Sequence, residues 1–124
     1  MATILVVDDE PSVRDLLRTV LARKGHEVVI AHDGQKALLR FRQDRPDVTI
    51  LDLKLPDIDG INVLRQIHAV NPNHPVIILT GRWTETDEQQ ARELGVVEFI
   101  EKGFSLHVLG KALLRALNYP VSGH

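Results

Sequence analysis

Hydrophobic residues are spaced along the chain in two alternating patterns, which predict strands and helices in turn. Short runs rich in β-branched residues predict five strands, at residues 3–7, 27–31, 48–51, 76–79 and 96–101. The runs at 48–51 and 76–79 are continuously apolar, which is typical of strands whose two faces are both buried. The run at 27–31 leads into no chemically notable residue, as expected of an edge strand.

Between these runs, apolar residues recur three or four positions apart, which predicts amphipathic helices. The clearest stripe follows Pro11, at a first helical position, and the helix ends at Gly25. This stripe consists of Val13, Leu16, Leu17, Val20 and Leu21. Four more helices are expected, from about 33 to before 46, from about 59 to 71, from 84 to 93, and from 105 to about 117. The helix at 84–93 has a thin apolar stripe, so we expect a weakly anchored, movable element.

Five repeats of strand and helix predict an α/β fold with helices on both faces of a parallel sheet and right-handed crossovers. We expect a single-domain, doubly wound (βα)5 flavodoxin-like fold, with five strands in the order 2-1-3-4-5. Residues 1–117 would form the domain, and residues 118–124 a tail or the start of a linker.

Composition narrows the class of protein. The chain has 124 residues, 44% hydrophobic and 26% charged, as is ordinary for one globular domain. Its net charge of −2 gives no reason to expect nucleic-acid binding. It shows no apolar run long enough for a membrane span and no signal-peptide pattern. The absence of cysteine excludes disulfides and thiolate metal sites and suits a cytoplasmic protein.

Four of the five predicted strands end on reactive polar residues. The first leads into Asp8-Asp9-Glu10, the third into Asp52, the fourth into Thr80 and the fifth into Lys102. In an open parallel sheet, ligands bind outside the carboxyl ends of the strands, near the point where strand order reverses. We therefore expect these side chains to form one site.

The predicted strand order places the first and third strands side by side, so Asp8, Asp9 and Asp52 should converge. Neighbouring carboxylates repel one another and raise each other's pKa values, and Lys102 offsets only one charge. A hard divalent cation with oxygen ligands would offset the rest. Mg²⁺ takes one or two carboxylates and keeps waters for a phosphate-bearing partner, so we expect Mg²⁺ here.

Each of these residues also has a simpler interpretation. Asp8, Asp9 and Glu10 can merely begin a helix, where acids favour the macrodipole. Thr80 can be a strand-end cap and Lys102 a surface lysine. Asp52 is harder to explain this way, because an acid that ends an apolar strand is close to buried. The joint pattern favours a site. The six histidines show no i, i+4 pairing, so we expect surface positions and no metal ligand among them.

The order and spacing of these motifs resemble the receiver domain of bacterial two-component response regulators. The resemblance covers about Thr3 to Leu117. It is carried by Asp8-Asp9, Asp52, Leu55-Pro56-Asp57-Ile58-Asp59-Gly60, Thr80-Gly81 and Phe99-Ile100-Glu101-Lys102.

The resemblance implies a role in phosphorelay signalling, not a separate enzyme, although the domain assists its own phosphorylation and dephosphorylation. It makes Asp52 the acceptor of a phosphoryl group from a sensor histidine kinase, a histidine phosphotransfer protein or a small phosphodonor. Asp9 and Asp52 would bind Mg²⁺ directly, Asp8 through water, and the Lys54 carbonyl would complete the protein ligands. Thr80 and Lys102 would contact phosphoryl oxygens, which matches the charge neutralisation that phosphoryl transfer needs.

The resemblance also implies a switch from Thr80 to Phe99, and an output face on the fourth helix, fifth strand and fifth helix. Phosphorylation should promote either dimerisation or partner binding there. We expect this face to centre on Trp83, Glu88, Glu98, Glu101 and Arg115. Phe99 can also be plain core filling, and Trp83 can instead cap the apolar ends of the fourth and fifth helices.

The chain departs from the family pattern at two positions. Gly103 follows Lys102 where the family usually has proline with a cis bond. A non-proline cis bond costs ~3–4 kcal/mol, so the bond is either trans or held under strain. Phe99 lacks the hydroxyl of the tyrosine often found there.

Two other classes share parts of this pattern. A flavin-binding flavodoxin-like protein needs a phosphate loop after the first strand, where Asp8-Asp9-Glu10 would repel a phosphate. A Mg²⁺-dependent phosphatase of the haloacid-dehalogenase type places its nucleophile in Asp-x-Asp after the first strand. The output stays open: no DNA-binding, ATPase or cyclase module is visible, so the chain is a stand-alone receiver or part of a longer regulator.

Overall fold

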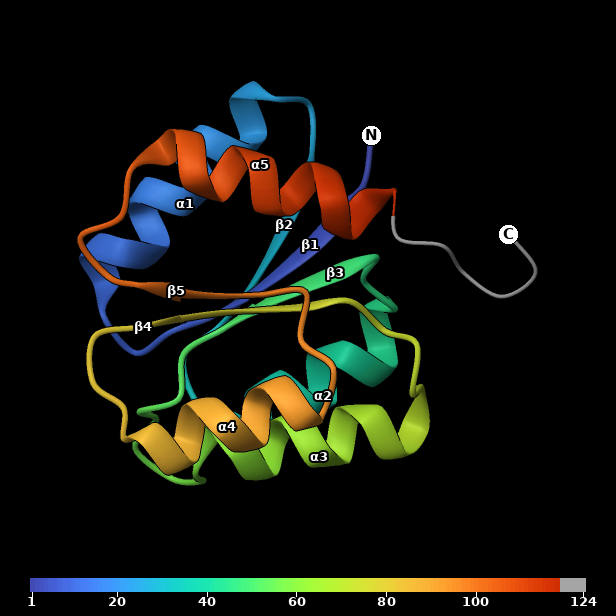
Figure 1. The fold of residues 1–124 in the computed structure, drawn as a ribbon. Coiled ribbons are helices and arrows are strands. Elements are labelled where there is room, and N and C mark those ends of the chain that lie inside the picture. The colour runs from blue at the N-terminus through green and yellow to red at the C-terminus, as the bar shows by residue number, and fades with distance from the viewer. Residues whose placement is uncertain (119–124) are drawn as a thin grey trace.

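The computed structural model describes residues 1–118, which form five strands and five helices in strict alternation (Figure 1). The elements are β1 (Thr3–Val7), α1 (Pro11–Arg23), β2 (Glu27–Ala31), α2 (Gly34–Asp44), β3 (Val48–Leu51), α3 (Gly60–Val70), β4 (Val76–Thr80), α4 (Glu85–Glu93), β5 (Glu98–Glu101) and α5 (Leu106–Leu117). All strand pairs are parallel and the order is β2-β1-β3-β4-β5. The predicted fold class and strand order are confirmed.

The sheet is the middle layer of three. Figure 1 shows α1 and α5 on one face and α2, α3 and α4 on the other. Each face has its own apolar core: Leu17 and Leu109 belong to the first, and Phe41 and Leu64 to the second. Every residue of β3 and β4 is buried, which explains why these two runs have no polar alternation.

The predicted helix starts are capping residues, and the helices begin one position later. Asp33, Asp59, Thr84 and Ser105 each accept a backbone N–H of the first turn through the side chain. Thr84 forms a reciprocal capping box with Asp87, at 3.1 and 3.0 Å. A cap of this kind stabilises a helix by about 1 kcal/mol.

The fifth strand begins two residues later than predicted. The N–H of Val96 donates to the carbonyl of Ala91 at 3.3 Å, and Gly95, with φ +83°, lets the chain turn there. Val96 therefore closes the end of α4 instead of joining the sheet. The apolar run did not distinguish a helix end from a strand start.

His74 is buried, which corrects the expectation that all six histidines lie on the surface. It is 5% exposed, its Nε2 lies 2.8 Å from Thr49 Oγ1, and its ring packs edge-on against Phe41. Burial, reinforced by nearby His68 and opposed by Asp47, lowers the pKa of His74 to about 4. The His74 ring fills space in the core and stays neutral. The absence of i, i+4 histidine pairs in the sequence argued against metal ligands, but it carried no information on whether a single histidine is buried.

The predicted domain ends at residue 117, one residue before the last described residue. Helix α5 finishes at Leu117, and Asn118 is its C-cap. The rest of the predicted tail, residues 119–124, lies outside the described residues. No helix within residues 1–118 is both long and apolar enough to cross a membrane.

Candidate functional site

The polar residues at the strand ends meet at one edge of the sheet. Asp8 follows β1, Asp52 follows β3, Thr80 ends β4 and Lys102 follows β5. Asp8 and Asp52 are each 2% exposed and Thr80 is fully buried. Parallel strands bring their carboxyl ends together, so residues as far apart as Asp8 and Lys102 share one site.

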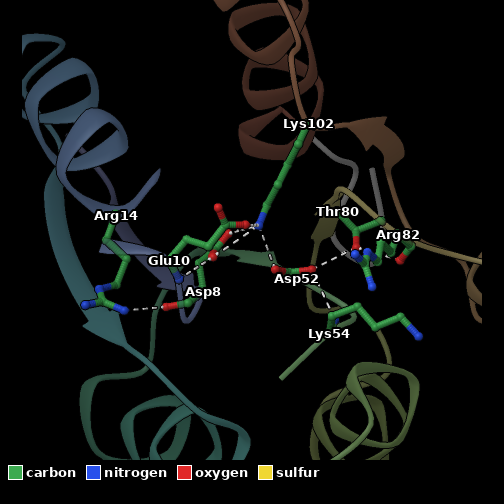
Figure 2. A network of polar contacts seen from close by, with 8 residues as sticks. All are labelled: Asp8, Glu10, Arg14, Asp52, Lys54, Thr80, Arg82 and Lys102. Atoms are coloured by element: carbon green, nitrogen blue, oxygen red, sulfur yellow. Dashed lines mark hydrogen bonds and ion pairs between the residues drawn. The ribbon is translucent and has the colours of Figure 1, made fainter. Parts of the chain in front are cut away.

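Lys102 is the central cation of this site. Its Nζ lies 2.8 Å from Oδ2 of Asp52 and 3.2 Å from Oδ2 of Asp8, and it forms a third ion pair with Glu10. Figure 2 shows the Lys102 side chain reaching between the acids that follow β1 and the acid that follows β3. The two strand ends are thus joined through one ammonium group.

The Asp52 carboxylate is held from three directions. Its Oδ1 accepts the hydroxyl of Thr80 at 2.8 Å and the backbone N–H of Lys54 at 3.1 Å, while its Oδ2 accepts Lys102. The Thr80 hydroxyl also lies 3.0 Å from the carbonyl of Arg82, so its one hydrogen can serve either acceptor. These three contacts fix the orientation of the Asp52 carboxylate. The Thr80 hydroxyl has the Arg82 carbonyl as an alternative acceptor.

The ionisation of the site reflects burial and crowded charge. Burial raises the pKa of Asp8 to about 6, with a further contribution from Asp52, although the Glu10 N–H and Lys102 act against it. Burial lowers the pKa of Lys102, but its hydrogen bonds to Asp52 and Glu10 and the nearby negative charges outweigh burial and raise that pKa. Lys102 is therefore a permanent cation.

The structure brings Glu10 into the site and leaves Asp9 at its rim. Carboxylate oxygens of Asp8, Glu10 and Asp52 lie within 4.8 Å of one another. Asp9 is exposed and lines the same cavity, but it is not in that group. The sequence placed Glu10 among the strand-end acids but gave it no role as a ligand. It stands at the N-cap of α1 without a side-chain capping bond, and its place in Asp8-Asp9-Glu10 was the available signal.

An open cavity of about 680 Å³ lies over the acids. It is lined by the acids Asp9, Glu10 and Asp52, by Lys102, and by Lys54, Gly81, Arg82, Trp83 and Thr84. Lys54 and Arg82 are exposed, and the Lys54 ammonium in Figure 2 points away from Asp52. The cavity opens to solvent, and Asp52 is one of its lining residues.

Phe99 lies between an aromatic ring and a cation. The Trp83 ring packs edge-on against it with centroids 5.5 Å apart, and the Arg92 guanidinium lies 6.0 Å from its centroid. Trp83 and Phe99 are both half-buried and pack in the core that α2, α3 and α4 cover. Trp83 therefore contacts the predicted switch residue directly, on the opposite side of the sheet from α5.

The bond after Lys102 is trans. No peptide bond in residues 1–118 is cis, and Gly103 has φ +91°, a left-handed conformation that favours glycine. Of the two alternatives that the sequence left open, a trans bond and a strained cis bond, the structure has the trans bond. Lys102 thus contacts Asp8 and Asp52 with a trans bond and no proline after it.

Gly60 explains part of the Leu55–Gly60 motif. Its N–H donates to the carbonyl of Leu53 at 3.0 Å, and a Cβ at this position would lie 2.4 Å from Leu53 Cα. Only glycine permits this approach of α3 to the backbone that follows Asp52. The contact anchors the far end of the β3–α3 loop.

The residues present fit a hard divalent cation. Three carboxylates within 4.8 Å are countered by one ammonium, and burial together with the charge of Asp52 raises the pKa of Asp8. Oxygen-only donors of this kind are those that Mg²⁺ binds. The site offers no sulfur ligand, since the chain has no cysteine.

A three-layer parallel fold with this acidic edge defines an α/β domain whose site, at the carboxyl ends of the strands, suits a divalent cation. The sequence matches the response regulator receiver domain over residues 4–114, and the chain belongs to that family. It is a receiver domain of response regulators, and its role lies in phosphorelay signal transduction. Because the chain belongs to this family, the flavin-binding and phosphatase interpretations of the sequence are set aside.

Individual relatives agree with this assignment. The chain is 39% identical to the transcriptional regulatory protein TrcR of Mycobacterium tuberculosis, over 92% of this chain and 44% of TrcR. It is also 39% identical to the response regulator MprA of Mycobacterium avium, over 92% of this chain and 50% of MprA. The chain thus spans about half the length of the curated relatives it matches. The non-phosphorylated HemR receiver domain of Leptospira biflexa superposes with a TM-score of 0.92 at 27% identity, covering all of both chains.

Proposed function

We propose that Asp52 accepts a phosphoryl group from a phosphohistidine, on a sensor histidine kinase or a histidine phosphotransfer protein. The observation that carries the proposal is the held carboxylate of Asp52, which contacts Thr80, Lys102 and the Lys54 N–H at 3.1 Å or less. A small phosphodonor such as acetyl phosphate would serve as an alternative source.

In the transfer, a carboxylate oxygen of Asp52 attacks phosphorus. A P–O bond forms, the P–N bond to the donor imidazole breaks, and its electron pair stays on the imidazole nitrogen. Catalysis of such a step depends on position and on neutralising the equatorial oxygens. Lys102 and Thr80, which already contact Asp52, would donate to those oxygens.

Mg²⁺ is the proposed cofactor. Asp9, Asp52 and the Lys54 carbonyl would bind it directly, and Asp8 through water. When bound, it would neutralise carboxylate and phosphoryl charge. The crowded carboxylates of Asp8 and Asp52 around Lys102 support a bound cation at this edge, and the direct role of Asp9 follows from the family resemblance.

Phosphorylation would act on an output face formed by α4, β5 and α5. Thr80 would turn from Asp52 and Arg82 toward the phosphoryl group, and Phe99 would turn inward. The packing of Phe99 against Trp83 supports a coupled movement. We propose that the phosphorylated face forms a dimer or binds a partner, and that the domain assists its own dephosphorylation.

We further propose that residues 1–117 form the receiver unit and residues 118–124 a tail or the start of a linker. The end of α5 at Leu117 and the family match to residue 114 support this division. The cytoplasmic location and the lack of nucleic-acid binding by this chain stay predictions.

Mass spectrometry after treatment with acetyl phosphate and Mg²⁺ tests the acceptor. One added phosphoryl group is expected, lost in Asp52→Asn and kept in Asp15→Asn, which changes an exposed acid on α1. Labelling that persists in Asp52→Asn would overturn the proposal. A catalytic turnover of phosphodonor without stable labelling would instead indicate a phosphatase.

A further inference from the structure

Asp57, in the β3–α3 loop, binds the start of a different helix. Its Oδ1 accepts the N–H of Gly34 at 2.7 Å and its Oδ2 accepts the N–H of Gln35 at 3.0 Å. Both donors belong to the first turn of α2, more than 20 residues earlier in the chain. The Ile58 N–H adds a third contact at 2.9 Å.

These bonds complete the capping of α2. The first N–H groups of a helix have no partner within it. Asp33, the N-cap of α2, accepts Lys36 at 2.7 Å through its side chain and Ala37 at 3.0 Å through its carbonyl. The two donors that Asp33 does not serve are those that Asp57 accepts. Despite some desolvation, the backbone N–H groups of Gly34, Gln35 and Ile58 lower the pKa of Asp57, so its carboxylate stays charged.

The loop and α2 are also packed closely. A Cβ on Gly34 would lie 3.0 Å from Ile58 Cβ and 3.0 Å from Val63 Cγ2, and 3.2 Å from Asp57 Oδ1. Because Gly34 has no side chain, the loop can approach the helix to hydrogen-bonding distance. The contact therefore has a polar part at Asp57 and a steric part at Gly34.

The same loop starts at the candidate acceptor. The Lys54 N–H donates to Asp52, and Gly60 binds Leu53 at the other end. Between these two points, Asp57 provides the tie to α2. Besides this tie, the segment 54–58 is held by the packing of Leu55 and Ile58 against the core.

We infer that Asp57 is a positioning residue: it holds the β3–α3 loop against α2 so that the Lys54 backbone stays oriented toward Asp52 and the metal position. The inference rests on the proposed function, because Lys54 matters through Asp52. It assigns α2, which contributes no side chain to the site, a role in maintaining it.

The experiment compares Asp57→Ala with Asp33→Ala in the whole chain. Both variants remove a carboxylate cap from the first turn of α2, but only Asp57→Ala releases the loop. Mg²⁺ affinity is followed through the fluorescence of Trp83, the single tryptophan, which lines the cavity. Amide hydrogen exchange at Lys54 is followed by NMR without phosphodonor, and thermal unfolding measures stability.

Asp57→Ala is expected to weaken Mg²⁺ binding about tenfold, as loss of an outer contact to a metal site typically does. It should also speed exchange of the Lys54 amide. Asp33→Ala should lower the unfolding temperature but leave both readouts unchanged. Equal effects of the two variants on Mg²⁺ affinity and Lys54 exchange would overturn the inference, since Asp57 would then merely stabilise α2.

Two further variants keep the test decisive if Asp57→Ala folds poorly. Asp57→Asn retains an acceptor for one N–H and should give a smaller change in the same direction. Gly34→Ala disturbs the contact from the helix side, at a backbone conformation that alanine tolerates. If neither variant changes Lys54 exchange, the inference is wrong. Lys54 exchange needs no phosphoryl transfer, so failure of labelling at Asp52 would count against the proposed function and not against this inference.

Discussion

The ammonium nitrogen of Lys102 lies 2.8 Å from Oδ2 of Asp52, although 50 residues separate them in the chain. The Lys102 side chain is 15% exposed and that of Asp52 is 2% exposed. A pair so poorly solvated differs from a surface salt bridge, because removal of one partner leaves a buried charge without compensation. The site is therefore sensitive to changes of charge.

Asp8 is expected to destabilise the metal-free protein at neutral pH. Its pKa is about 6 in the folded chain against an ordinary value of 3.8, so folding disfavours its charged form. Below pH 3.8, Asp8 is protonated in both the folded and the unfolded chain and does not disfavour folding. As the pH rises through about 6, Asp8 ionises in the folded chain and the free energy of unfolding falls. A displacement of this size corresponds to roughly 3 kcal/mol.

Asp8→Asn should therefore raise the free energy of unfolding by up to about 3 kcal/mol near pH 8 and by little near pH 4, without Mg²⁺. Urea denaturation with a chelator measures this. Asp15→Asn, on the exposed side of α1, is the control and should show no such pH dependence. The same gain at both pH values would contradict the assignment.

His74 should make the fold sensitive to acid. Its pKa is about 4 in the folded chain against 6.5 ordinarily, so the unfolded chain binds the proton first. The contribution of neutral His74 to the free energy of unfolding is complete above pH 6.5. It is lost as the pH falls from about 6.5 toward 4, by roughly 3 kcal/mol. His74→Gln should show a shallower loss than the parent over this range, measured by urea denaturation. The exposed His107→Gln is the control, and a parallel loss in parent and His74→Gln would reject this explanation.

Mg²⁺ binding should weaken sharply in Asp9→Ala and less in Asp8→Ala, because a direct ligand is lost in the first and a water-mediated one in the second. Titration calorimetry measures both. Glu10→Ala is an informative comparison, since Glu10 lies in the carboxylate group that excludes Asp9. Equal losses at Asp8 and Asp9 would contradict the division between direct and indirect ligands.

Lys54 and Arg82 should protect the phosphoryl group from water. Both are long cations that line the cavity, two residues beyond Asp52 and Thr80. Replacing each with alanine should speed hydrolysis of the acyl phosphate without preventing its formation. The time course of phosphate loss measures this. Unchanged or slower hydrolysis in the double variant would show that the two residues are solvated surface charges.

Beryllofluoride with Mg²⁺, a mimic of the phosphoryl group, should shift NMR resonances mainly across Thr80–Gly110. The reason is that the Thr80 hydroxyl contacts the carbonyl of Arg82, the residue before Trp83, and the Trp83 ring packs against Phe99. Self-association or partner binding through α4, β5 and α5 should accompany the shifts. Shifts confined to the surroundings of Asp52 would show that no switch from Thr80 to Phe99 operates.

The sequence by itself determined the alternation of strands and helices and the polar residues that end four of the strands, and the strand order was predicted from the flavodoxin-like fold. The largely apolar runs at β3 and β4 favour burial on both faces, which a parallel sheet between two layers of helices supplies. Asp8, Asp52 and Lys102 follow strands directly and Thr80 ends one, so parallel strands in the order β2-β1-β3-β4-β5 bring these four side chains together.

Tertiary structure decided the features that depend on the direction of individual side chains. Glu10 turns to Lys102 instead of capping α1, Asp57 crosses to α2, and His74 enters the core beside Phe41. Each of these side-chain positions depends on a group that is distant in sequence: the Lys102 ammonium for Glu10, the first N–H groups of α2 for Asp57, and the Phe41 ring for His74. Sequence spacing encodes which face of an element is buried, but not which distant group a polar side chain meets, because that depends on how the layers pack.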